Sequence, residues 1–122
     1  MASTDSNRDL VLVRASEAKR GTSAYLQGVT RWVLANNPNL LLAKHDMPAG
    51  THVAKHQHPQ DQLVYMISGK LRWEVGGEQF VIAEGDSIII RGGVPHECWS
   101  DEGAVSLDIF HPTRPDFVNE GH

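Results

Sequence analysis

The apolar residues of this chain fall into short runs, many of them rich in β-branched residues, that are separated by Gly, Pro and Asn. Short runs bounded by such residues predict β-strands rather than helices. About ten of them recur at the spacing of roughly 8 to 12 residues that is typical of β-sandwiches and β-barrels. The predicted strands cover residues 10–13, 29–35, 40–45, 51–56, 62–68, 71–75, 79–83, 87–90, 95–99 and 104–110. We therefore expect an all-β fold.

Glycines mark the turns between several of these strands. Gly76-Gly77 separates two apolar runs by two residues, which is a strong signal for a β-hairpin. Gly69-Lys70 predicts another turn, so residues 62–68 and 71–75 are expected to be separate strands. Helix signals are confined to Ser16–Lys19, one turn at most. With 122 residues and no repeat or linker in the sequence, we predict a single domain, residues 1–122.

The alternation of side chains along residues 62–68 predicts an unusual surface. If Gln62 points into the barrel, Val64, Met66 and Ser68 do so too, because strand side chains alternate with period two. The outward positions are then apolar or aromatic: Leu63, Tyr65 and Ile67. Such a stripe must be covered. A homodimer packed through this sheet is favoured, and an extra layer from the N-terminal strands is the alternative.

Composition narrows the partners and the compartment. The formal net charge is −4 and no cluster of Lys or Arg stands out, so nucleic acid and anionic membranes are poor partners. The single cysteine, Cys98, indicates a reducing compartment. Residues 1–8 are polar and expected to be disordered, without a signal-peptide core. The longest apolar runs are too short to span a bilayer, and we predict a cytoplasmic protein. Residues 112–122 are expected to be a polar tail.

Histidines supply the candidate chemistry. His56 and His58 lie one residue apart on an extended segment, Gln62 follows, and His96 ends a second turn-rich segment. Three imidazoles and an amide carbonyl that converge would hold one divalent transition metal: Zn, Ni, Fe, Mn or Cu. The alternative is that these are surface or packing histidines. His52 shares strand parity with His56 and is either an alternative ligand or, more readily, a hydrogen-bonded residue near the turn. His45 is predicted to be structural.

Two spaced motifs resemble those of the cupin superfamily. The first runs Gly50-x5-His56-x-His58-x3-Gln62-x6-Gly69, and the second Gly85-x7-Gly93-x2-His96-x3-Ser100. The resemblance covers residues 38–111 and implies a single-domain cupin, a double-stranded β-helix or jelly-roll barrel. The sequence departs from the family pattern at three positions. It has Gln62 where the family usually has Glu, Arg91 where it has proline and Ser100 where it has asparagine.

A second group of residues follows on the last predicted strand. Asp108 and Phe110 lie two apart and share one side. Burial would raise the pKa of Asp108 towards the range where it can move protons, and the fork of Arg114 could grip a carboxylate. The alternative is an Asp108–Arg114 ion pair that only closes the barrel. Arg91 is either a second substrate cation or a cap at a strand end.

Within the cupins, the combined pattern resembles the small pectin degradation proteins, the KdgF family. The resemblance implies a metal-dependent enzyme that opens 4,5-unsaturated uronates from pectin and alginate to linear keto-acids. It implies metal ligands at His56, His58, Gln62 and His96, proton transfer by Asp108, carboxylate binding by Arg114 and a pocket shaped by Phe110. Two other functions remain open: an iron-dependent cupin dioxygenase, and a non-catalytic sugar- or metal-binding module.

For two further residues, Trp73 and Cys98, a packing interpretation is weighed against a role at the site. Trp73 alternates with apolar residues and is expected to pack in the core, although an aromatic ring could also line a sugar pocket. Cys98 follows His96 by two, which predicts that both lie on one face of a strand, and the packing interpretation is a buried cytoplasmic thiol. In the C-terminal tail, Phe117 and Val118 are the only expected anchors.

Overall fold

A computed structural model describes residues 9–21 and 27–119, so the prediction for residues 1–8 lies outside the described residues. The expected all-β fold is confirmed. The elements in chain order are η1 (Ala15–Glu17), β1 (Lys19–Arg20), β2 (Thr30–Asn36), β3 (Leu41–Met47), β4 (Thr51–His56), β5 (Asp61–Val75), β6 (Glu78–Ala83), β7 (Ser87–Ile90), β8 (His96–Ser100), β9 (Ala104–His111) and α1 (Pro115–Val118).

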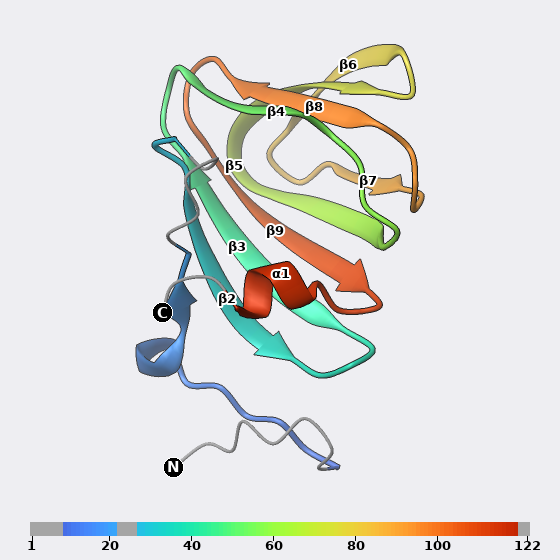
Figure 1. The fold of residues 1–122 in the computed structure, drawn as a ribbon. Coiled ribbons are helices and arrows are strands. Elements are labelled where there is room, and N and C mark those ends of the chain that lie inside the picture. Colours follow the sequence, from blue (N-terminus) through green and yellow to red (C-terminus); the bar gives the residue numbers. More distant parts are fainter. Residues whose placement is uncertain (1–8, 22–26, 120–122) are drawn as a thin grey trace.

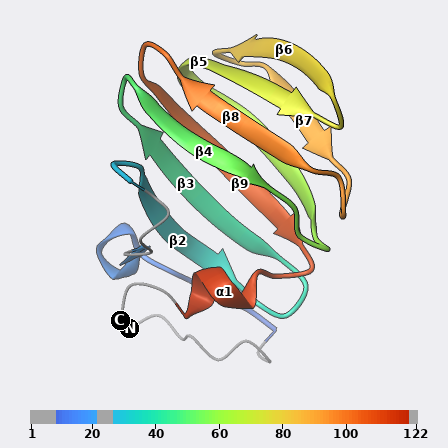
Figure 2. The same cartoon turned by 45° about the horizontal axis from the view of Figure 1, so that its top comes forward.

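The strands form one curled antiparallel sheet that folds over on itself (Figures 1 and 2). One layer contains β1, β2, β3, β9, the first half of β5 and β7. The other contains β4, β8, the second half of β5 and β6. The main apolar core lies between the two layers, with Val64 and Met66 on one side and Leu71 and Trp73 on the other. This is the jelly-roll arrangement expected from the sequence.

The predicted turn at Gly69-Lys70 is wrong, because β5 is one continuous strand of 15 residues. Its first half pairs with β9 and its second half with β8, so it bends from one layer into the other. Gly69 has φ of +76°, and a Cβ atom there would collide with the backbone of Gly103. The glycine therefore serves a bend with close backbone approach rather than a chain reversal. The hairpin at Gly76-Gly77 forms as predicted.

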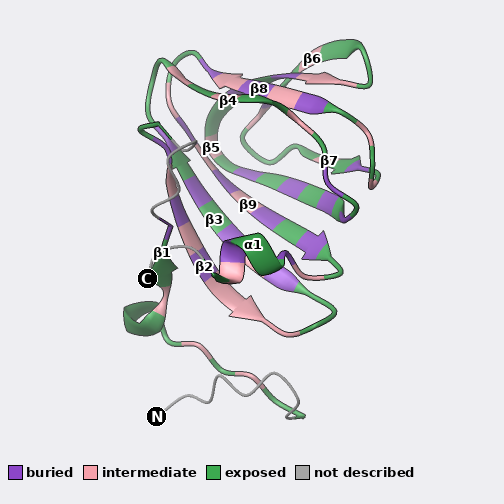
Figure 3. Ribbon diagram, viewed as in Figure 1, coloured by how far each residue is buried: buried purple, intermediate pink, exposed green. Residues whose placement is uncertain are grey.

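The alternation predicted for residues 62–68 is confirmed from residue 62 to residue 67, whereas Ser68 is only half-buried and follows a register irregularity after Met66 (Figure 3). Gln62, Val64 and Met66 are buried, whereas Tyr65 is 46% exposed. Its outward neighbours are apolar and exposed as well: Leu63, Ile67, Ile89 and Ile109. The alternative of a covering N-terminal layer is wrong for the described part of the chain, because β1 extends the sheet edge beside β2.

The two ends of the described chain differ from expectation. Residues 10–13 form no strand, and Leu10 and Leu12 are exposed. The C-terminal segment is not a free polar tail up to residue 119. Phe117 of α1 is buried against Leu41 and Phe110, which confirms it as an anchor. Within the described residues, none of the helices has the length and apolar character needed to cross a bilayer.

Candidate metal and substrate site

Three imidazole rings meet at one end of the space between the layers. His56 is the last residue of β4, His58 lies in the following loop, and His96 is the first residue of β8. The ring centroid of His96 lies 4.3 Å from that of His56 and 4.8 Å from that of His58. One ligand nitrogen from each ring lies within 4.8 Å of the other two. This spacing allows one divalent cation to contact all three rings.

Backbone carbonyl groups orient the three rings. Each ring places Nδ1 within hydrogen-bond distance of a carbonyl oxygen two residues away: His56 to Ala54 at 2.8 Å, His58 to Gln60 at 3.0 Å and His96 to Val94 at 2.8 Å. A neutral ring that donates from Nδ1 keeps a lone pair on Nε2. Nε2 of His96 is buried and has no hydrogen-bond partner among the described residues. The rings therefore present Nε2 to a shared ligand, as metal-binding histidines do.

Gln62 brings a carbonyl oxygen to the same cluster. Its Nε2 donates to Oδ2 of Asp108 at 2.7 Å, which turns its Oε1 away from the carboxylate. Oε1 lies 3.1 Å from Nε2 of His58. When His58 donates from Nδ1 to the Gln60 carbonyl, Nε2 and Oε1 are two acceptors in contact. The other tautomer only moves this conflict to the Gln60 carbonyl. A cation between Nε2 and Oε1 removes it, so these residues fit a metal ion.

The three histidines are neutral at ordinary pH, as metal ligands must be. Burial lowers the pKa of His96 to about 4, with smaller contributions from the neighbouring rings and Arg114. Burial also lowers the pKa of His56 and of His58, and the positive charge of Arg114 adds to the shift in both. Desolvation disfavours the imidazolium form because a charge is costly to remove from water. The lone pairs are thus available without prior loss of a proton.

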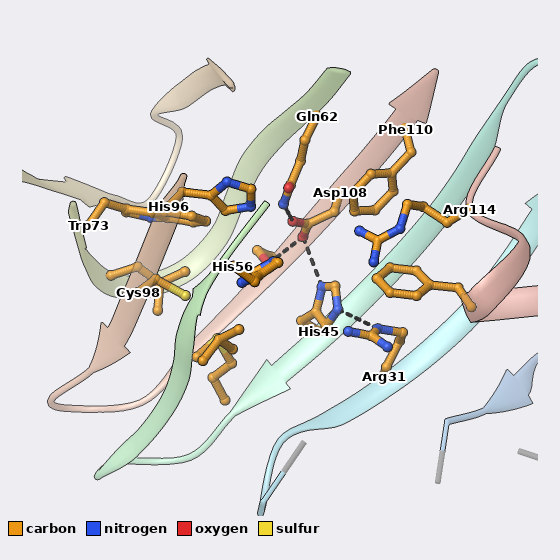
Figure 4. Close-up of a pocket in the computed structure, with 15 residues that line it drawn as sticks. Arg31, His45, His56, Gln62, Trp73, His96, Cys98, Asp108, Phe110 and Arg114 are labelled. Carbon is orange, nitrogen blue, oxygen red and sulfur yellow. Dashed lines mark hydrogen bonds and ion pairs between the residues drawn. The ribbon is translucent and has the colours of Figure 1, made fainter. Parts of the chain in front are cut away.

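Asp108 departs from the expectation that burial would raise its pKa. Burial does act in that direction, but His45 and the hydrogen bonds from His45, Ser106 and Gln62 outweigh it, and the pKa of Asp108 is lowered. The carboxylate accepts from Ser106 Oγ at 2.7 Å, in addition to Gln62. Asp108 is therefore an anion held by donors (Figure 4). The alternative Asp108–Arg114 ion pair is also wrong, since the carboxylate of Asp108 contacts His45 at 3.0 Å and Arg114 pairs with Asp116.

Arg114 follows β9 and precedes α1, and its side chain is buried in the wall of the cavity. Its guanidinium lies over the ring of Phe117 at 3.9 Å and over that of Phe110 at 5.0 Å. It also forms two hydrogen bonds with the carboxylate of Asp116, at 2.7 and 3.0 Å. Phe110 packs its ring edge-on against His58, with centroids 5.6 Å apart. The structure therefore brings Asp108, Phe110 and Arg114 into the wall of the cavity that His56 and His96 also line.

His52 and Arg91 are not part of this cavity. His52 is exposed, contacts Glu97 and stacks on Trp99 with a ring distance of 5.3 Å. The alternative that it is a ligand is wrong because β4 contains a register irregularity between Val53 and His56. One extra residue reverses the side-chain alternation, so His52 points out and His56 points in. Arg91 is exposed and does not line the cavity as a second substrate cation.

Cys98 and Trp73 both line the cavity. Cys98 is buried on the same face as His96, and burial raises the pKa of its thiol to about 12. A protonated thiol is a poor metal ligand, since the thiolate is the binding form. Trp73 belongs to the main core, as predicted, and its ring also borders the cavity.

Sequence reasoning missed two residues of the cavity, Arg31 and His45. His45 was expected to be structural, and Arg31 of β2 was not among the expected site residues. The two are partners across β2 and β3, and Arg31 Nε donates to His45 Nε2 at 2.9 Å (Figure 4). Arg31 also lies 3.5 Å above Phe117, on the ring that Arg114 contacts. The signal available in the sequence was strand parity. Arg31 lies two residues before the apolar Val33, so the two share one face of β2, and both are buried.

The fold and the cluster define a cupin, and residues 43–110 match the family model described as a cupin domain. The chain belongs to this family. Among curated proteins it is similar to the pectin degradation protein KdgF of Dickeya dadantii (strain 3937), with 27% identity over 75% of this chain and 84% of that protein.

The fold is also similar to those of solved structures, among them a cupin and a KdgF protein. An RmlC-like cupin from Shewanella frigidimarina NCIMB 400 has a TM-score of 0.78 and 26% identity, covering 85% of this chain and 92% of that one. The structure of KdgF from Halomonas sp. also has a TM-score of 0.78, with 24% identity, covering 88% of this chain and 97% of that one. The protein is therefore a cupin that resembles KdgF.

Proposed function

We propose that this cupin binds one divalent transition metal through His56, His58, His96 and Gln62, and that it converts 4,5-unsaturated uronates to linear keto-acids. The contact between His58 Nε2 and Gln62 Oε1 carries the metal part of the proposal. With the ring proton on Nδ1, facing the Gln60 carbonyl, it brings two acceptors to 3.1 Å, an arrangement that a cation bound to both atoms would stabilise. Nitrogen and neutral oxygen donors suit Zn, Ni, Fe, Mn or Cu. When bound, the metal supplies Lewis-acid polarisation of substrate oxygens.

The walls of the cavity support an acidic substrate. Arg114 is a buried cation, and a substrate carboxylate would bind its planar fork beside or in place of the exposed carboxylate of Asp116. Phe110 keeps the guanidinium in place from one side and limits the width of the cavity. The similarity to KdgF of Dickeya dadantii supports an unsaturated uronate as the acid in question.

The reaction is an isomerisation that needs no oxidant or co-reactant. The anomeric hydroxyl loses its proton, the bond between C1 and the ring oxygen breaks, and a C1 carbonyl forms. The enol that remains at C5 becomes a ketone when C4 receives a proton. In this proposal Asp108, held as an anion, accepts the hydroxyl proton and returns it to C4. Arg114 holds the carboxylate at C6 throughout, which fixes the sugar relative to Asp108.

The test is to follow unsaturated galacturonate by NMR with metal-loaded protein. We expect the cyclic form to disappear faster than in buffer, and an Arg114→Met variant to raise KM at least ~10-fold, the scale of a lost charged hydrogen bond. An Arg72→Met variant, at a surface arginine outside the cavity, is the matched control. If metal-loaded wild-type protein gives no acceleration over buffer, the uronate activity is wrong. Oxygen uptake with the iron form would then favour the dioxygenase.

Two further predictions belong to this proposal. Homodimerisation through the exposed face around Tyr65 is supported by its apolar neighbours on β5, β7 and β9. A reducing, cytoplasmic location is supported by the single cysteine, which is a free buried thiol in this fold.

A further inference from the structure

Four buried side chains form a continuous chain of hydrogen bonds that ends at the candidate metal ligands. Arg31 donates to His45, His45 contacts Asp108, and Asp108 accepts from Gln62. The successive distances are 2.9, 3.0 and 2.7 Å, and all four side chains belong to residues that are less than 10% exposed. They come from β2, β3, β9 and β5, four neighbouring strands of one layer. Arg31 lies outside the residues matched by the family model.

The direction of the hydrogen bonds in this chain follows from two groups that cannot reverse their roles, because the guanidinium of Arg31 only donates and the carboxylate of Asp108 only accepts. A guanidinium has only donors, so Nε2 of His45 must be an acceptor. The proton of the neutral ring then sits on Nδ1 and points at Oδ1 of Asp108. The carboxylate accepts at both oxygens and therefore selects the NH2 end of the Gln62 amide. The reversed amide would press Oε1 against Oδ2, two acceptors at 2.7 Å.

We propose that Arg31 and His45 are positioning residues that act through Asp108 to keep the carbonyl oxygen of Gln62 turned towards the three histidines. An amide has two ends of nearly equal shape, and only one can bind a cation. A glutamate would not need such control, because both of its ends are oxygen. The chain of donors thus supplies the selection that an amide ligand requires. This inference rests on the proposed metal site and not on the identity of the substrate.

A double-mutant cycle tests the inference with Zn²⁺ alone as the probe. Zinc affinity is measured by competition with a chromophoric chelator for wild type, His45→Leu, Gln62→Ala and the double variant, with folding checked by circular dichroism. We expect His45→Leu to weaken zinc binding by ~10- to 100-fold, the usual effect of removing a group that orients a ligand. In the Gln62→Ala background the same substitution should have no further effect. His52→Leu, an exposed histidine outside the cavity, should leave affinity unchanged.

The conservative variant His45→Asn should recover most of the affinity, since its amide can place a donor close to the position of Nδ1. Independent losses in the double variant would overturn the inference, as would a folded His45→Leu protein with wild-type affinity or a wild-type protein without zinc binding. Failure of the uronate activity alone would leave these outcomes unaffected, so the two proposals fail separately.

Nitrogen-15 NMR of histidine-labelled wild-type protein gives a readout that does not depend on any variant folding. We expect His45 to show a protonated Nδ1 and an unprotonated Nε2 at neutral pH. In Arg31→Met, where the donor to Nε2 is gone, Nε2 is no longer held as an acceptor, so the nitrogen shifts of His45 should change. The opposite tautomer in wild type would overturn the proposal, and an unchanged spectrum in Arg31→Met would overturn the role of Arg31.

Discussion

The helix α1 is predicted to hold Arg114, the proposed carboxylate-binding residue, in place through one buried ring, that of Phe117. The side chain is 3% exposed and lies between two guanidinium groups, Arg31 at 3.5 Å and Arg114 at 3.9 Å. It also packs edge-on against Phe110, with ring centroids 5.2 Å apart. Because the ring joins the last element of the fold to both arginines of the cavity, its removal should affect stability and carboxylate binding together.

The expected cost of Phe117→Ala is about 3 to 5 kcal/mol of unfolding free energy, as for other buried Phe-to-Ala changes. Each cation–π contact accounts for about 0.5 to 2 kcal/mol of such a loss. A domain of this length has a total stability of about 6 to 18 kcal/mol, so the variant should fold but with a clearly lower denaturation midpoint. Phe117→Leu keeps most of the apolar volume and should lose less than half as much.

Urea denaturation followed by tryptophan fluorescence measures the loss, and KM for the unsaturated uronate measures the effect on Arg114. Leu12→Ala, at an exposed position near the N-terminus, is the control and should change stability by less than about 0.5 kcal/mol. A Phe117→Ala protein that loses less than about 1 kcal/mol would refute the packing argument, because a ring buried between two cations cannot be removed without cost.

Three further predictions follow from single features of the structure. The metal-free protein should lose stability as pH falls from about 6.5 to about 4, because in this window the unfolded chain protonates His96 while the folded chain does not. Thermal melts at several pH values should show this loss, and His96→Asn should flatten the dependence of the melting temperature on pH. Tyr65→Glu should convert a dimer to a monomer in multi-angle light scattering, and a wild-type protein that is already monomeric would contradict the predicted interface. Gly69→Ala should lower the free energy of unfolding by about 2 kcal/mol or more, whereas Gly77→Ala, with a similar positive φ but open space around it, should lower it by about 1 kcal/mol. Equal losses in urea denaturation would show that the close approach of Gly69 to Gly103 does not matter.

Period-two alternation and turn residues identified most of the strands. The core positions Val64 and Met66 and the outward position of Tyr65 followed from parity alone. The same parity failed for His52, because an extra residue in β4 shifts the register before His56 and no sequence pattern marks it. The turn signal at Gly69 also failed, since a glycine with positive φ is equally compatible with a chain reversal and with a bend inside a strand.

The sequence by itself determined the strand pattern, the spacing of the three histidines and Gln62, and the resemblance to cupins, because these are properties of the order of residues along the chain. Only the tertiary structure decided which groups compensate one another. Burial alone would have raised the pKa of Asp108, but the fold places His45, Ser106 and Gln62 around the carboxylate and reverses the direction. Likewise, the contact of Arg31 with His45 and the position of its guanidinium over the ring of Phe117 depend on which strands and helices come to lie side by side. Charges and hydrogen bonds act through space, so their balance becomes known only once distant segments meet.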